Sequence, residues 1–519
     1  MIKNKEIFNN SSEVQLPIVI IGAGTVGLLL AHELMNAGKQ IILIEAGTDG
    51  IGSFSENEFT SIGHPHNGVK IGRAKGVGGT TNLWGGQLAE FTAKDVSEQS
   101  DFGQPSWPIS WSELSLYYPI IYEKLGFSSK CPVEPEKLSD NKDSGWLELF
   151  YTRWLKQPNF KYHFLRDLMN SESVSIQENT VVTSMDFLND KCISVTVYKN
   201  GIYEQIGNFD KLILANGTIE ICRLLLMAKN VANCPFSKNR WIGKYFQDHL
   251  NIMIGQVVRP SKSLFARFSN IISNGEKFQP KIRINDTLES EGHLGITGFF
   301  SFDSKVSHHI DNVKQFVKAI TGRSNQRIGF EGKFKMFVKV IRAAPQIVLI
   351  IYNYVRKNKI YVPFTSAVTL TLQAQQISIA RSEITISEHA KDELDRPKAI
   401  IDWQIDGREF GKIKDFCLRL GIYLESNGLG ILNHEKWYEE ACIGNDGKWM
   451  EHVSDVYHQA GGTIMSHTPE TGVVDTNLKI HGTSNVFIAG ACVMPTSGYA
   501  NTTLTALALT MRLAHHLKN

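Results

Sequence analysis

Two side chains near the end of the chain have the types and the setting needed for acid–base chemistry. His458 and Asn501 are separated by an apolar, strand-like stretch at 486–490, and Asn501 directly precedes an apolar segment with helical spacing. An imidazole accepts a proton near neutral pH because its ordinary pKa is ~6.5. An amide donates hydrogen bonds without ionising. The pair is therefore suited to removing the proton from an alcohol and holding the developing alkoxide.

The apolar segment after Asn501 predicts a helix that begins near Thr502 and Thr503. The first turn of a helix offers free N–H groups and a partial positive charge. That position favours an electron-rich ring or a developing anion beside the histidine–asparagine pair.

A glycine-rich fingerprint lies at the other end of the chain. The apolar run 17–21 is typical of a buried parallel strand, and Gly22, Gly24 and Gly27 follow it in GxGxxG spacing. A helical pattern then leads to a second strand, 41–44, which ends at Glu45. This is the context of a dinucleotide site, in which the acid binds a ribose hydroxyl and the helix start binds pyrophosphate. An acid at this position favours an unphosphorylated ribose, as in NAD or FAD.

A second glycine-rich segment, 76–87, separates these two cofactors. Its glycines allow backbone amides to approach a ligand closely, and Thr80, Thr81 and Asn82 add short polar groups. A second glycine-rich loop can contact a long cofactor that extends across the domain, but it has no evident role in binding NAD. The segment therefore favours FAD. A structural glycine loop without a ligand is the alternative.

Composition limits the class of protein. The 519 residues are too many for one simple core, and the 42% hydrophobic and 20% charged fractions are those of a globular protein. A net charge of +2 gives no general attraction to nucleic acid. The seven cysteines are scattered without CxxC spacing, which predicts reduced thiols and neither disulfides nor a metal site. Residues 1–14 are polar and contain no apolar signal region, so we expect a cytoplasmic protein.

The middle of the chain has a different pattern. Alternation over 366–372 predicts an antiparallel sheet above the active site, and Gln373 and Gln375 follow it. These two side chains either contact a polar substrate or lie on a solvated strand face. Residues 381–386 and 397–403 have the pattern of paired strands.

A basic segment, 314–359, interrupts this region. Its eleven lysines and arginines face a single acid, Glu331, and aromatic residues recur among them. The pattern predicts a helical insertion at about 310–360 that packs on the protein. Peripheral membrane contact, or contact with an anionic substrate or partner, is the alternative. Nucleic acid is not expected, because the basic patch is local and no binding motif accompanies it.

These motifs resemble those of the glucose–methanol–choline (GMC) family of FAD-dependent alcohol oxidoreductases. The glycine fingerprint with Glu45 resembles the family's ADP-binding unit, and 78–86 resembles its flavin-cradling loop. The stretches 211–220 and 243–249 resemble two further family elements, a strand–turn–helix and a GRxxxDH motif. The resemblance covers almost the whole chain.

The resemblance implies an α/β fold with a Rossmann-like FAD-binding domain and an antiparallel-sheet substrate domain. Residues 1–250 are expected to hold the first part of the FAD-binding domain with interspersed substrate-domain segments, 251–440 the substrate domain, and 441–519 the second FAD-binding part. The residues implied to bind FAD are Gly22, Gly24, Thr25, Gly27, Glu45, Gly79, Thr80, Asn82, Leu83, Trp84, Gly85, Gly86, Val182, Ala215, Gly490, Ala491, Asn501, Thr502 and Thr503.

Within the family, the His458 and Asn501 pair is similar to that of the pyranose 2-oxidase and bacterial sugar-oxidoreductase branch. This implies oxidation of a CH–OH group in a sugar or sugar-like polyol, with oxygen, a quinone or another carrier as electron acceptor. Leu83 stands where that branch has a flavin-linking histidine, so the FAD is expected to be non-covalent. A non-redox flavin lyase, oxidation of a non-sugar alcohol and an NAD(P)-dependent dehydrogenase are the alternatives.

Overall fold

A computed structural model describes residues 16–50, 58–97, 100–128, 136–138, 145–285, 292–303, 358–444 and 447–518, with Gly52 and scattered positions between 331 and 356. Most of the basic segment 314–359 lies outside the described residues. In the described part of the chain, no helix has the length and apolar character required to span a membrane.

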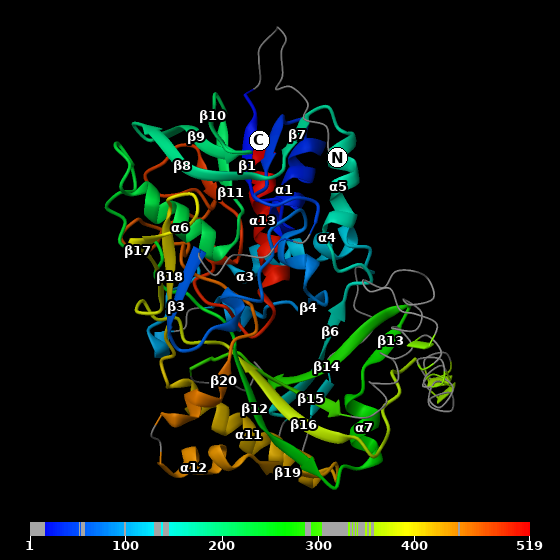
Figure 1. The fold of residues 1–519 in the computed structure, drawn as a ribbon. Helices are drawn as coiled ribbons and strands as arrows, with labels where there is room; N and C mark the ends of the chain where they lie inside the picture. The colour runs from blue at the N-terminus through cyan, green and yellow to red at the C-terminus, as the bar shows by residue number, and fades with distance from the viewer. Residues whose placement is uncertain are drawn as a thin grey trace.

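A five-stranded parallel sheet forms the centre of the upper half of the molecule (Figure 1). Its order is β21 (Val486–Ile488), β11 (Lys211–Leu214), β1 (Ile18–Ile21), β2 (Ile41–Ile44) and β7 (Val174–Gln177). The strands are short and almost wholly apolar because both faces of a parallel sheet are covered. The predicted strands at 17–21 and 41–44 are confirmed.

Two helices distant in sequence pack beside each other on this sheet. They are α1 (Thr25–Asn36) and α13 (Thr502–Lys518), and both are mostly buried. α13 is the helix predicted after Asn501. The two ends of the described chain therefore meet in one core, with α4 (Tyr117–Lys124) and α5 (Lys161–Asn170) against α13 and α1, respectively.

A ten-stranded antiparallel sheet forms the lower half. Its path is β19 (Ile431–His434), β12 (Leu250–Val258), β16 (Ala367–Ala374), β15 (Ile296–Asp303), β14 (Glu276–Ile284), β6 (Leu147–Trp154) and β4 (Gln87–Leu88), with β5 (Glu136–Leu138), β13 (Ile271–Ser273) and β20 (Val453–Ser454) alongside.

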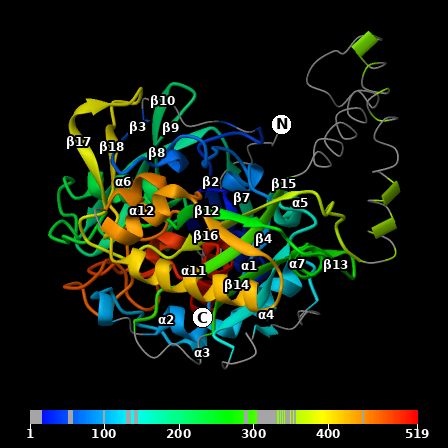
Figure 2. The ribbon, with the colours of Figure 1, turned by 90° about the horizontal axis from the view of Figure 1, so that it is seen from below.

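The two faces of this sheet differ because side chains alternate along each strand. One face, which includes Ile252, Leu370 and Ile282, packs with α11 (Glu409–Ser426) in one core, and α11 lies across it in the view from below (Figure 2). The other face carries polar side chains such as Gln373, Thr297 and Lys281. This alternation confirms the antiparallel sheet predicted from 366–372.

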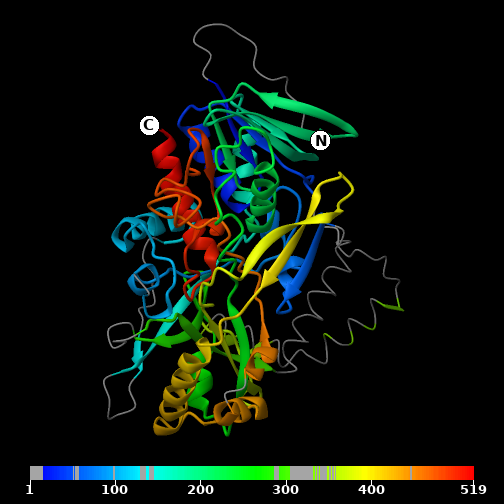
Figure 3. The same cartoon turned by 90° about the vertical axis from the view of Figure 1, so that its left-hand side faces the viewer.

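Two smaller sheets complete the fold (Figure 3). One contains β8 (Thr180–Leu188), β9 (Lys191–Lys199) and β10 (Ile202–Gly207). The other contains β3 (Phe59–Gly63), β17 (Glu383–Lys391) and β18 (Pro397–Trp403). The predicted pairing of the last two strands is confirmed, and together with β3 they form a sheet separate from the ten-stranded one.

Among the residues that the structure describes, the remaining helices are short. They are α2 (Ala93–Val96), α3 (Trp111–Ser115), α6 (Thr218–Ala228), α7 (Lys262–Phe268) and α12 (Lys436–Gly444), with 3-10 turns at Asn67–Val69, Gly79–Asn82, Ser100–Phe102, Lys448–His452 and Ala491–Val493. The mixed α/β class expected from the sequence is confirmed.

Candidate active site

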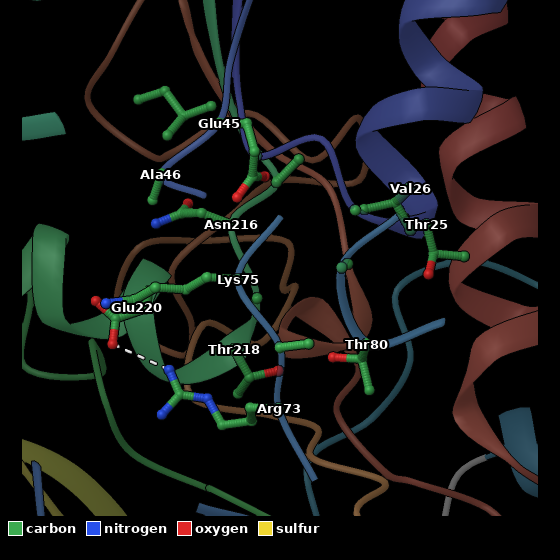
Figure 4. A pocket seen from close by; sticks show the side chains of 18 of the residues that line it. Thr25, Val26, Glu45, Ala46, Arg73, Lys75, Thr80, Asn216, Thr218 and Glu220 are labelled. Carbon is green, nitrogen blue, oxygen red and sulfur yellow. Dashed lines mark hydrogen bonds and ion pairs between the residues drawn. The ribbon is translucent and has the colours of Figure 1, made fainter. Parts of the chain in front are cut away.

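A cavity that opens to solvent lies at the carboxyl ends of the parallel strands (Figure 4). This edge is where α/β sheets bind their ligands. The predicted cofactor residues that line it are Gly22, Gly24, Thr25, Glu45, Gly79, Thr80, Val182, Ala215, Gly490, Ala491, Thr502 and Thr503. Segments from both ends and the middle of the chain therefore meet at one site.

Two features of the cavity fit a bound FAD. A Cβ on Gly22 would lie 2.6 Å from the carbonyl oxygen of Ala215, so only glycine fits this turn at φ +103°. Oδ1 of Asn216, beside Glu45 in Figure 4, is buried and has no hydrogen-bond partner among the described residues. An orphaned acceptor in a cavity is an expected feature of a site for a ligand with donor groups.

Glu45 connects three loops at this end of the cavity. Its Oε2 accepts a hydrogen bond from the Ala23 amide at 2.8 Å, and its Oε1 accepts from the amides of Gly47 and Gly76 at 2.9 and 3.0 Å. A carboxylate has about four acceptor positions, so these bonds leave capacity for a ribose hydroxyl. Ribose binding by Glu45 stays a prediction, while its role in joining both glycine-rich segments was not foreseen.

Seven of the predicted cofactor residues do not line the cavity. Gly27 packs beneath Gly22, where an added Cβ would lie 1.9 Å from the Gly22 oxygen. Asn82 donates to the carbonyls of Val77 and Gly79, and Trp84 donates to the Pro158 carbonyl. The others are Leu83, Gly85, Gly86 and Asn501. Their contacts with FAD stay predictions.

The structure brings His458 and Asn501 together. Nδ2 of Asn501 donates to Nε2 of His458 at 2.9 Å. The backbone at Tyr457 has φ +67°, a left-handed conformation that few non-glycine residues adopt, directly before His458. The His458 amide donates to Oδ1 of Asp248 at 3.0 Å. Asn501 is held by its place at the start of α13.

His249 determines which nitrogen of His458 carries the proton. Its Nε2 contacts the carbonyl oxygen of Gly498 at 2.8 Å, and a carbonyl only accepts, so Nε2 must be the protonated nitrogen. In the neutral ring its Nδ1 is then an acceptor, and this atom lies 2.9 Å from Nδ1 of His458. His458 must therefore donate through Nδ1. Its Nε2, which faces Asn501, keeps a lone pair.

The electrostatics of the cluster keep both imidazoles neutral. Burial, together with the neighbouring His249, lowers the pKa of His458 to about 3. Burial also lowers the pKa of His249. Burial opposes ionisation of Asp248, but the hydrogen bond from His66 and the nearby imidazoles outweigh it, so the pKa of this carboxyl is lowered. The site therefore holds a neutral base above a fixed carboxylate.

The two predicted substrate residues differ in their surroundings. Gln375 is fully buried, where its Oε1 accepts from the Gly295 amide at 3.2 Å and its Nε2 donates to Gln104 at 3.3 Å. Gln373 is half-buried, and its Oε1 accepts from Nζ of Lys281 at 2.7 Å. Sequence reasoning missed Lys281, because one lysine in an alternating strand carries no motif. The GRxxxDH resemblance marked the stretch containing His249 without indicating its bond to His458.

The chain is similar in sequence and in fold to known oxidoreductases. Residues 378–510 match the family model described as GMC oxidoreductase. The fructose dehydrogenase large subunit of Gluconobacter japonicus is 21% identical to this chain, and the alignment covers 97% of each of the two chains. Pyridoxine 4-oxidase of Mesorbium loti has a similar structure, with a TM-score of 0.60, 14% identity and coverage of 97% of this chain and 99% of that one. Formate oxidase of Aspergillus oryzae RIB40 also has a similar structure, with a TM-score of 0.58 and 14% identity. The match covers 98% of this chain and 99% of that one.

Proposed function

Because the chain is an FAD-dependent oxidoreductase whose residues 378–510 match the GMC oxidoreductase model, we propose that it oxidises a CH–OH group of a sugar or sugar-like polyol. The observation that carries this proposal is the 2.9 Å contact between Nε2 of His458 and Nδ2 of Asn501. A base with a fixed lone pair and an amide donor at hydrogen-bond distance match the two needs of an alcohol oxygen.

Each residue of the pair has one task. The alcohol oxygen enters between the two side chains and replaces their direct hydrogen bond. Its hydroxyl then donates to Nε2 of His458, which takes the proton, and its oxygen accepts from Nδ2 of Asn501. Nδ1 of His458 keeps its own proton, because it is bonded to His249. FAD, when bound, supplies the acceptor for the hydride that leaves the carbon. The start of α13, directly after Asn501, places partial positive charge beside the developing anion.

A sugar substrate and non-covalent FAD belong to the same proposal. The fructose dehydrogenase large subunit, named for a sugar, is similar over nearly its whole length. Leu83 at the end of the 3-10 turn Gly79–Asn82 has no group that bonds covalently to a flavin. The electron acceptor in the proposal is oxygen, a quinone or another carrier.

Replacement of the base tests the proposal. His458→Ala should keep the yellow FAD-bound form and slow anaerobic bleaching by a substrate alcohol about 10²- to 10⁴-fold, the usual contribution of a general base. His467→Ala is the matched control, because His467 is exposed. Stopped-flow absorbance of the flavin measures both. Bleaching of His458→Ala at the wild-type rate would contradict the proposal.

A further inference from the structure

Lys281 is a buried cation in an unusual setting. It lies on β14 on the polar face of the ten-stranded sheet, only 4% exposed. Its Nζ donates to Oε1 of Gln373 and lies 5.1 Å from the ring centre of Phe299. Among the described residues, no carboxylate lies within ion-pair distance of it. A buried ammonium without a counter-ion is costly, so a ligand that brings a negative charge would stabilise the charged form of Lys281.

A neighbour on the same strand provides the contrast. Arg283 faces the same side of β14, two residues along, and pairs with Glu148 at 2.7 Å. Its Nη1 also donates to the hydroxyl of Tyr499 at 2.6 Å. The arginine therefore has a counter-ion and a structural task, whereas the lysine beside it has a neutral amide partner only.

Strand register connects Lys281 to the catalytic pair. Gln373 pairs with Asn251 on β12, and His249 directly precedes the first residue of this strand, Leu250. Tyr499, which Arg283 holds, is two residues before Asn501. Lys281 is also near enough to both imidazoles for its charge to lower the pKa of His249 and of His458.

We propose that Lys281 and Gln373 form a subsite for a carboxylate on the substrate, so that the alcohol deprotonated by His458 is a hydroxy acid such as a sugar acid. One carboxylate oxygen accepts from Nζ of Lys281. The other accepts from Nε2 of Gln373, which has no partner among the described residues. One cation and one amide match the single charge and two oxygens of a carboxylate. This inference rests on the proposed function, because it states which alcohol is oxidised.

The subsite should lose its anion as pH rises. Burial lowers the pKa of Lys281 to about 7, so the ammonium is present below this pH and is lost above it. Of the groups facing it, His249 and His458 have lowered pKa values and are neutral in that range. Arg283 lies 2.7 Å from Glu148. Affinity for a carboxylate should therefore fall about tenfold for each pH unit above 7.

Matched substrates test the inference on the holoenzyme. Half-saturation of anaerobic bleaching is measured at pH 6 for glycerate against glycerol and for gluconate against glucose. We expect the concentration of each acid that half-saturates bleaching to be at least tenfold lower than that of its neutral partner. Lys281→Gln and Lys281→Met should remove this preference, so that each acid and its neutral partner half-saturate the bleaching at similar concentrations. Lys277→Gln, on the same face of β14, is the control and should behave as wild type.

A non-oxidisable probe keeps the two proposals distinct. Acetate, and not acetamide, should raise the thermal midpoint of the wild-type holoenzyme at pH 6, and both lysine variants should lose the effect. If the neutral alcohols bleach the flavin as well as the acids do, or the variants keep the acid preference, the carboxylate subsite is wrong and the proposed function stands. If no alcohol bleaches the flavin but acetate binds through Lys281, the proposed function fails and the anion subsite remains. Equal effects of acetate and acetamide overturn the subsite.

Discussion

At the scale of single residues, the role proposed for His458 depends on its partners. The chain has 16 histidines, and this one is distinguished by a bond from Asn501 to Nε2 and a bond to His249 from Nδ1. The sequence context around His458 and Asn501 correctly indicated that the two would meet. The tautomer of His458 could not be predicted, because it depends on the Gly498 carbonyl and on His249, which lies 209 residues before His458 in the chain.

The pH profile should reflect the lowered pKa of His458. An exposed imidazole, with its ordinary pKa of ~6.5, would lose activity as a base below neutrality. Burial and His249 lower the pKa to about 3, so the ring is already deprotonated at pH 5. The limiting rate of flavin reduction by a saturating neutral alcohol should therefore be flat from pH 5 to 9. A rate that rises through a midpoint near 6.5 in stopped-flow measurements would show that the base is not buried in the working enzyme.

His249 should act as a positioning residue for His458. His249→Ala removes the acceptor that holds the Nδ1 proton, and we expect flavin reduction to slow about 10- to 100-fold. Because His249 also lowers the pKa of His458, the acid limb of the pH profile should move up toward neutrality. His249→Asn offers an amide oxygen near the Nδ1 position and should recover most of the rate. A uniform loss in both variants with an unchanged pH profile would indicate a purely structural role.

At the scale of elements, local patterns were the more reliable guide. The strand–turn–helix–strand from β1 to β2 was predicted because its signals lie within about 30 consecutive residues and their chemistry is local. The pairing of β12 with β16 was not predictable, because more than 100 residues separate strands whose alternation suits many partners. Lys281 faces Gln373 only through that non-local sheet, which is why neither side chain identified the other in the sequence.

The close packing of α1 against the first glycine turn gives an element-scale prediction. Gly27→Ala places a Cβ 1.9 Å from the Gly22 carbonyl oxygen, and backbone cannot move aside cheaply. We expect a loss of about 1–3 kcal/mol in the free energy of unfolding and poor FAD retention. Gly411→Ala in α11 is the matched control, because nothing lies within 4 Å of the added Cβ. It should stabilise the protein by up to about 1 kcal/mol. Denaturant unfolding and flavin absorbance measure both variants, and equal FAD content in the two would contradict the expectation.

At the scale of the whole molecule, the cofactor cavity joins distant parts of the chain. Its lining runs from Ile21 to Ala506 and includes Val182 from the β8 sheet and Arg396 beside β18. Three of the four sheets therefore meet at the cavity, while the ten-stranded sheet carries the polar face near the catalytic pair. A ligand bound here contacts segments that lie far apart in the sequence and adds contacts between them. FAD should accordingly contribute to stability as well as to chemistry.

Reversible removal of FAD tests this link and the non-covalent attachment together. Trichloroacetic acid precipitation should leave the yellow colour in the supernatant, because Leu83 offers no group for a flavin bond. Mild acid and high salt should strip the native protein, and its thermal midpoint should fall. Added FAD should restore the midpoint in a concentration-dependent manner, since free ligand at 100 times Kd stabilises by about 2.7 kcal/mol. Gly27→Ala is the matched comparison. The thermal midpoint of its FAD-free form should rise less when the same concentration of FAD is added, because its glycine turn is displaced. Colour in the precipitate would overturn the non-covalent assignment. A thermal midpoint that does not change when FAD is added would show that bound FAD does not stabilise the fold.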